Sequence, residues 1–159
     1  MAIEDNLNAA TSAYAFYDAY MNTVAQEMGM EKALALHTKM CENMGPLRGQ
    51  MLKGQTHIKD FDAKAAYSVV KTVPNTLGIA TEVLEESPQK VRFKCKQCSV
   101  YEAAMLVGLD QKTREAICRN GSIVFMDKVL KQLNPKLSYR LVKYRSSAGD
   151  FCEEAIVSG

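Results

Sequence analysis

Apolar residues recur every three or four positions through the first third of the chain, which is the spacing of one face of an α-helix. Gly29 divides this pattern into two stripes, and glycine readily takes the left-handed conformation that ends a helix. Pro46 predicts a kink or break in the second helix, because proline lacks the N–H of the helical hydrogen bond. The stripes are Ile3, Leu7, Ala10, Tyr14, Tyr17, Met21, Val24 and Met28, then Met30, Leu34, His37, Cys41, Met44 and Met51. They predict a helical hairpin over residues 1–54 that packs on the rest of the domain or on a second copy.

The pattern changes after residue 60, where short segments of alternating apolar and polar residues lie on either side of segments with helical spacing. Alternation predicts two β-hairpins, each made of two strands that bring apolar side chains to one face. Three segments between the hairpins have the caps and spacing of helices. The predicted elements are a helix from Asp60 or Asp62 to Pro74, strands at 79–84 and 91–95, helices at 99–108, after Asp110 and after Ser122, and strands at 137–142 and 151–157.

This order of elements favours an α+β fold in which an antiparallel sheet of two β-hairpins carries helices on one face. We expect a single domain over residues 1–159, with the helical hairpin at 1–54 and an α+β core at 60–158. Hydrophobic residues form 47% of the chain and charged residues 24%, the balance of a globular protein.

Charge and cysteine content narrow the class of function. The net charge of +2 is too small to indicate nucleic acid or a membrane surface as a partner. No apolar run approaches the ~20 residues of a membrane helix. Five cysteines are an odd number, which argues against a disulfide framework and favours a cytoplasmic protein with reduced thiols.

Cys95 and Cys98 have the CxxC spacing of zinc sites and redox pairs. No second CxxC is present, so a zinc site of Cys98, Cys118 and Cys152 stays an alternative. Cys95 falls on the apolar face of its strand and is expected to be buried. Cys98 lies where that strand ends and a helix begins, and a helix N-terminus lowers the pKa of a thiol. Cys98 is therefore either an activated nucleophile or a packed thiol at the corner between strand and helix.

The segment from residue 144 to residue 154 contains a second group of candidates. Gly149 and Asp150 fit a turn for backbone reasons alone, although Asp150 is also a candidate acid or base. Arg145 is expected either to hold a carboxylate through its planar fork or to lie in solvent at a strand end. In an ideal strand, Cys152 shares a face with Glu154 and Ile156.

The histidines and the N-terminal aromatic residues are weaker candidates. His37 lies on the apolar stripe and is expected in the core or at an interface. His57 lies in a polar linker, where it is either a loop residue or part of a site. Aromatic residues at helical spacing, here at positions 14, 16, 17 and 20, are more typical of a core than of a ligand site.

Together these residues resemble the L-2-amino-thiazoline-4-carboxylic acid hydrolase family, which is distantly similar to the four-vinyl-reductase, hydrocarbon-binding domains. The resemblance rests on the CSVYE segment at 98–102, Gly108, Cys118, the LNP segment at 133–135, Arg145, Gly149, Asp150 and Cys152. It implies hydrolysis of a small cyclic amidine carboxylic acid, in which a thiazoline ring opens at a C–N bond to give S-carbamoyl-cysteine. The candidate catalytic residues are then Cys98, Cys118, Asp150 and Cys152. The candidate substrate-binding residues are Tyr101, Glu102 and Arg145, together with His57 from the linker before the matched segment.

Two other interpretations stay open. The hydrocarbon-binding relatives imply a domain that binds or senses a small molecule without catalysis, and an apolar pocket would favour that function. The second interpretation is a structural protein whose N-terminal helices form a homodimer and whose cysteines are only packed in the core. The expected partners are therefore a small-molecule ligand or substrate and a second copy of the chain, and the cofactor left open is zinc.

Overall fold

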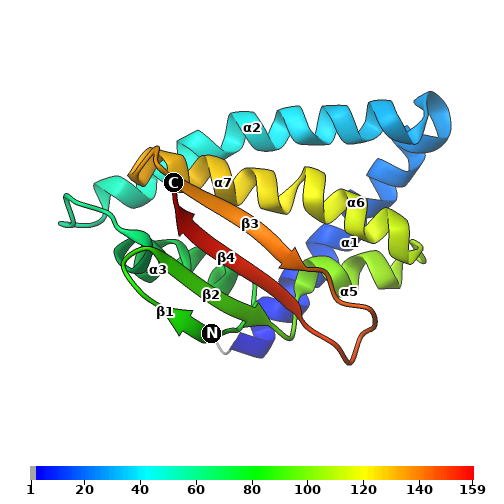
Figure 1. Cartoon of the computed structure of the whole chain (residues 1–159). Helices are drawn as coiled ribbons and strands as arrows, with labels where there is room; N and C mark the ends of the chain where they lie inside the picture. Colours follow the sequence, from blue (N-terminus) through cyan, green and yellow to red (C-terminus); the bar gives the residue numbers. More distant parts are fainter. Residues whose placement is uncertain (1–2) are drawn as a thin grey trace.

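Four antiparallel strands form one sheet in the order β1-β2-β4-β3, so the two predicted hairpins join through β2 and β4 (Figure 1). A computed structural model of the chain describes residues 3–159, with side chains described from residue 5. The side chain of Ile3, the first residue of the predicted stripe, lies outside the described residues. The strands are β1 (Thr81–Glu86), β2 (Lys90–Cys95), β3 (Leu137–Lys143) and β4 (Cys152–Ser158).

Helices cover one face of this sheet and leave the other open, which confirms the predicted α+β class (Figure 1). They are α1 (Ile3–Met28), α2 (Met30–Gly54), α3 (Ala63–Val70), α4 (Thr72–Thr76), α5 (Ser99–Leu106), α6 (Gln111–Asn120) and α7 (Ser122–Leu133). The helical hairpin turns at Gly29, whose φ is 90°. No helix within residues 3–159 is long and apolar enough to cross a membrane.

Two of the predicted caps are present, and a third is shifted by one residue. The carboxylates of Asp62 and Asp110 each accept a hydrogen bond, at 2.7 Å, from the backbone N–H three residues later. Ser122 is the first residue of α7, and Gly121 occupies the N-cap position. The helix expected to run to Pro74 is divided at Lys71 into α3 and α4.

Pro46 does not break α2, which continues through it from Met30 to Gly54. The neighbouring glycines explain this, because they bring the backbone of α2 against α7. A Cβ atom on Gly45 would lie 2.6 Å from Cβ of Lys128, and one on Gly49 would lie 2.6 Å from the Val129 carbonyl oxygen. Tertiary packing over this length supports the helix despite the missing hydrogen bond.

The two faces of the sheet differ in polarity. The covered face carries buried residues such as Phe93 and Ile156. The open face carries ion pairs across the strands, including Arg92 with Glu153 at 2.8 Å. Glu153 and Glu154 are consecutive residues of β4, so their side chains point to opposite faces. Glu154 therefore points towards the helices, between its strand neighbours Phe93 and Leu141.

Candidate functional site

A cavity of about 320 Å³ lies between the covered face of the sheet and the helices. Residues of α1, α2, α4, α5, α6 and α7 and of β2, β3 and β4 line it, and most of them are apolar or aromatic. Its volume falls at the lower end of the range for small-molecule sites. An engineered cavity of about 150 Å³ holds benzene, so there is room here for one or two rings.

The N-terminal helices supply part of the wall. Tyr14 and Tyr17 of α1 and His37 of α2 line the cavity. The Tyr17 hydroxyl and His37 Nδ1 are 2.6 Å apart. Burial raises the pKa of Tyr17 to about 12 and lowers that of His37, so both side chains are neutral near pH 7. The sequence pattern correctly predicted a buried His37 but not that it would border a cavity.

Three of the predicted catalytic thiols, Cys98, Cys118 and Cys152, meet at the cavity wall, together with Cys95. Cys98 occupies the N-cap position of α5, as its location in the sequence predicts. The predicted lowering of its pKa is wrong. Burial raises the pKa of Cys98 to about 11, which outweighs the lowering effects of the Tyr101 backbone N–H and of Arg145. Burial also raises the pKa of Cys118 well above its usual value.

Cys98 and Cys118 are therefore held in their protonated form. A thiolate is the form in which cysteine attacks a substrate or binds a metal. Across the described part of the chain, no group of three or more His, Cys, Asp or Glu side chains is arranged to hold a metal ion.

Glu154 is the acidic group of this wall, and the predicted site residues did not include it. The Tyr139 hydroxyl donates a hydrogen bond to Oε2 of Glu154. Burial raises the pKa of Glu154, and the bond from Tyr139 and the charge of Arg145 only partly offset this effect. A carboxyl group with a raised pKa inside a cavity is a candidate acid or base. The sequence signal is the position of an acidic residue on the apolar face of a strand, between Cys152 and Ile156.

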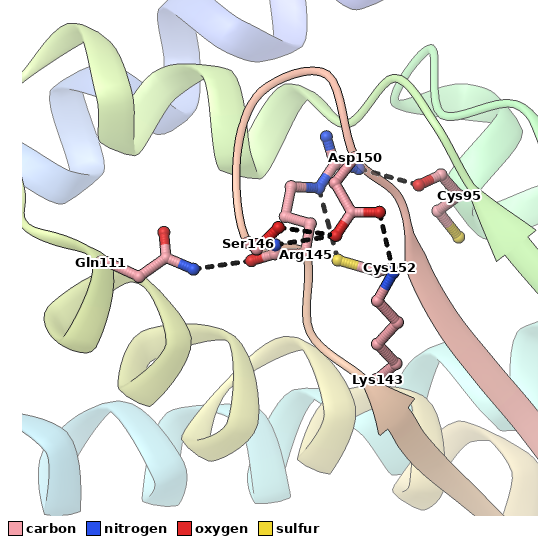
Figure 2. Close-up of polar contacts among 7 residues, drawn as sticks. All are labelled: Cys95, Gln111, Lys143, Arg145, Ser146, Asp150 and Cys152. Carbon is pink, nitrogen blue, oxygen red and sulfur yellow. Dashed lines mark hydrogen bonds and ion pairs between the residues drawn. The ribbon is translucent and has the colours of Figure 1, made fainter.

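Arg145 is only 2% exposed, yet it is not among the described residues that line the cavity. Its Nη2 donates to the Cys95 carbonyl oxygen at 2.8 Å, and its Nε donates to Sγ of Cys152 at 3.4 Å (Figure 2). Its guanidinium lies 4.6 Å from the centre of the Tyr101 ring. This side chain therefore ties the end of β3 to β2 and β4, and the expectation that it lies in solvent is wrong.

Arg114 of α6 is the arginine that does line the cavity. It lies over the same ring as Arg145, with its guanidinium 5.3 Å from the centre of the Tyr101 ring. Its Nε is buried and has no hydrogen-bond partner within the described residues. Tyr101 lines the cavity as well, so this predicted site residue is placed where a ligand can touch it.

Asp150, Glu102 and His57 do not line the cavity within the described residues. Asp150 closes the turn between β3 and β4, where its carboxylate accepts from Lys143 Nζ at 2.8 Å and from the backbone N–H of Ser146 at 3.0 Å (Figure 2). These bonds hold the pKa of Asp150 well below its usual range, which does not suit a general acid. Glu102 lies in the first turn of α5, and His57 lies exposed in the loop after α2.

A second buried carboxyl group, Asp18 of α1, gives a prediction about stability. Asp18 is 1% exposed, and neither of its oxygens has a hydrogen-bond partner in the described structure. Burial raises its pKa to about 6. An acid with a higher pKa in the folded state contributes stability below its unfolded pKa, and that contribution is lost as pH rises through the folded pKa. Asp18 therefore destabilises the fold progressively between about pH 4 and pH 6.

Asp18→Asn is expected to raise the free energy of unfolding at pH 7.5 by about 1–2 kcal/mol and to change it little at pH 4. At pH 4 both side chains are neutral and both lack partners, so the change there is small. Urea unfolding at the two pH values measures it. Asp60→Asn, at an exposed loop residue, is the control and should have no such pH-dependent effect. Equal gains at both pH values for Asp18→Asn would contradict this account.

The fold and the cavity define an α+β domain built around an internal space of small-molecule size. The family model for L-2-amino-thiazoline-4-carboxylic acid hydrolase matches residues 8–153, so the chain belongs to this family. The match extends the resemblance seen in the sequence through the N-terminal helices.

Among solved structures, the chain is similar to the phenol-responsive sensory domain of the transcription activator PoxR, crystallised with phenol. The TM-score is 0.61 at 14% identity, over 91% of this chain and 74% of that one. At this identity the similarity shows a shared fold. No curated protein sequence matches the chain.

Proposed function

We propose that this chain binds a small, mostly apolar ring compound in the cavity, with a polar group of the ligand directed at Glu154 and Tyr139. The observation that carries the proposal is the cavity itself, about 320 Å³ in volume and walled mainly by apolar and aromatic side chains around one carboxyl group. Membership of the family and the fold shared with a sensory domain that was crystallised with phenol both support it.

The polar side chains specify which ligands fit. A polar group of a ligand loses its hydrogen bonds to water on entry and needs a partner inside. The Glu154 carboxyl group can donate when protonated and accept when ionised. A ligand with a hydroxyl or amine group at one end of an apolar ring therefore satisfies the cavity, and a ligand that is polar all round does not.

The protonation state of the thiols favours binding without covalent catalysis over a mechanism with a cysteine nucleophile. The raised pKa values of Cys98 and Cys118 keep them protonated, so the cavity holds no activated sulfur nucleophile at these positions. We therefore assign these cysteines to the wall of the binding site.

Titration of phenol into the wild-type chain by calorimetry tests the proposal, with saturable binding at one site per chain as the expected result. Glu154→Leu should weaken the affinity about tenfold, because it removes one of the two polar partners of the buried hydroxyl of phenol. Cys118→Phe should abolish binding, since the added ring occupies the cavity. Glu153→Leu is the matched control, because the neighbouring carboxylate faces the other side of the sheet. Absence of saturable binding, or equal effects of the two glutamate variants, would refute the proposal.

A second candidate function is hydrolysis of a cyclic amidine, favoured by family membership together with the raised pKa of Glu154. In this reaction Glu154 takes a proton from a water molecule, whose oxygen adds to the amidine carbon. Glu154 passes this proton to the ring nitrogen, and the second proton of the water follows it as the bond from the carbon to that nitrogen breaks. The carbon then becomes a carbonyl and the nitrogen leaves as a primary amine. Burial favours this role because a carboxyl group is most effective as acid and base when its pKa lies near the working pH.

Incubation with 2-amino-thiazoline-4-carboxylate, followed by detection of S-carbamoyl-cysteine, tests this candidate. Turnover should fall about 10²- to 10⁴-fold in Glu154→Gln. It should persist in Cys98→Ala, since the thiol is not the nucleophile in this scheme. Loss of turnover in Cys98→Ala alone would restore the cysteine mechanism, and no turnover in wild type would leave binding as the function.

A further inference from the structure

An apolar stripe runs along the outer side of α2, beside the face that the helix buries. It consists of Leu36, Met40, Met44, Leu47 and Met51, whose exposed fractions lie between 43% and 56%. Their spacing of four, four, three and four residues places them on one line of the helix surface. We define these five residues as the α2 stripe.

The α2 stripe has a symmetry along the chain that fits a second copy of itself. Leu36 and Met51 are equally distant from the point between residues 43 and 44, and so are Met40 and Leu47. Two copies of α2 that cross antiparallel at this point therefore bring Leu36 against Met51, and Met40 against Leu47, in both directions. This is the reciprocal contact that a twofold axis requires.

The amount of apolar surface also suits a dimer. At roughly 100 Å² for each half-exposed side chain of this size, the α2 stripe offers roughly 500 Å² of apolar area. A standard interface buries about 800 Å² on each partner, and slightly more than half of that is apolar. The stripe alone therefore supplies the apolar share of a standard interface.

The stripe also borders the cavity. Met40 and Met44 belong to both, and they are the only exposed side chains among the described residues that line the cavity. The cavity therefore reaches the surface beside α2. We propose that the α2 stripe is the interface of a homodimer in which α2 of one copy closes the cavity mouth of the other. The interface stands independently of the ligand, whereas its effect on ligand release rests on the binding function proposed above.

Sedimentation equilibrium of the full chain, without ligand, tests the interface. The wild type should be dimeric, and Leu47→Arg, which places a charge on the stripe outside the cavity wall, should weaken dimerisation at least tenfold. Leu106→Arg is the matched control on α5, because Leu106 is 72% exposed and belongs neither to the α2 stripe nor to the cavity wall. A wild-type chain that stays monomeric throughout, or an equal loss of dimer in the two variants, would overturn the interface.

Disulfide trapping tests the antiparallel register. The double variant Leu36→Cys/Met51→Cys should form a covalent dimer under copper–phenanthroline, whereas either single variant should not. Along one helix, residues 36 and 51 are about 22 Å apart, so the two positions cannot join within one chain. In the antiparallel register the two copies of residue 36 are also about 22 Å apart along the helix axis, and so are the two copies of residue 51. A disulfide needs Cα atoms within about 7 Å, so neither single variant can form one across the interface. Efficient trapping of the single variants would overturn this register.

Stopped-flow measurement of phenol release from the wild type, Leu47→Arg and Leu106→Arg tests the closure of the cavity. The monomeric Leu47→Arg variant should release phenol several-fold faster than wild type, while Leu106→Arg should match wild type. Equal release rates in all three proteins would overturn the closing role. Failure of wild type to bind phenol would instead count against the proposed function, because the two preceding experiments contain no phenol.

Discussion

Replacement of Arg145 by alanine is expected to lower the free energy of unfolding by about 3–5 kcal/mol, from the space left behind and the partner left unpaired. The side chain is buried against Tyr101 and donates to the Cys95 carbonyl oxygen and to Sγ of Cys152. Alanine leaves that carbonyl without this donor and removes the packing over the Tyr101 ring. Urea unfolding followed by circular dichroism measures the loss.

Arg145→Met separates packing from hydrogen bonding, because methionine fills much of the same space without donors. The free energy of unfolding of Arg145→Met should lie between that of the wild type and that of Arg145→Ala. A role of Arg145 as a carboxylate clamp predicts a different pattern, with near-wild-type stability and a large loss of affinity for acidic ligands. That pattern would contradict the structural role described above.

Gly121→Ala is expected to cost about 3 kcal/mol, at the upper end of the usual cost of overpacking. A Cβ atom at this position would lie 1.7 Å from Nε2 of His37, so the imidazole ring has to move. That ring is held at Nδ1 by the Tyr17 hydroxyl and borders the cavity, so its movement should also weaken phenol binding. Urea unfolding and phenol titration of the same variant measure the two effects.

Gly149→Ala is the matched control, since an added Cβ there meets no atom within 4 Å. The φ angle of Gly121 is −119°, outside the left-handed range that favours glycine, and the cost expected at Gly121 comes from the contact with His37. Similar losses of stability in both alanine variants would show that the contact with His37 is not responsible.

Local sequence signals predicted most of the fold because its elements are marked by local chemistry. Asp62 and Asp110 cap their helices as their positions predict, because each carboxylate accepts a hydrogen bond from a backbone N–H of the first helical turn. Alternation located all four strands and hence the α+β class. Pro46 was misjudged because the glycine contacts of α2 with α7 involve residues about 80 positions apart, which no local pattern displays.

The candidate site was predicted less well, because its chemistry depends on burial. Sequence position placed Cys98 at a helix N-terminus, but only the surrounding atoms reveal that desolvation reverses the expected pKa shift. Arg145 lies two residues after β3, where a polar side chain is usually exposed to solvent, and its burial arises from contacts with β2 and α5. Glu154 shared a face with Cys152 in the predicted strand, but the strand pattern does not reveal that helices enclose this face and form a cavity over it.

The cavity wall draws on residues from Tyr14 to Glu154, nearly the whole length of the chain. The α1 helix is made before β4 during synthesis, so a nascent chain has no complete pocket until β4 is inserted between β2 and β3. Occupancy of the pocket is consequently a measure of completed folding. A fluorescent compound that enters it would report, chain by chain, on how much of a preparation has reached the native state.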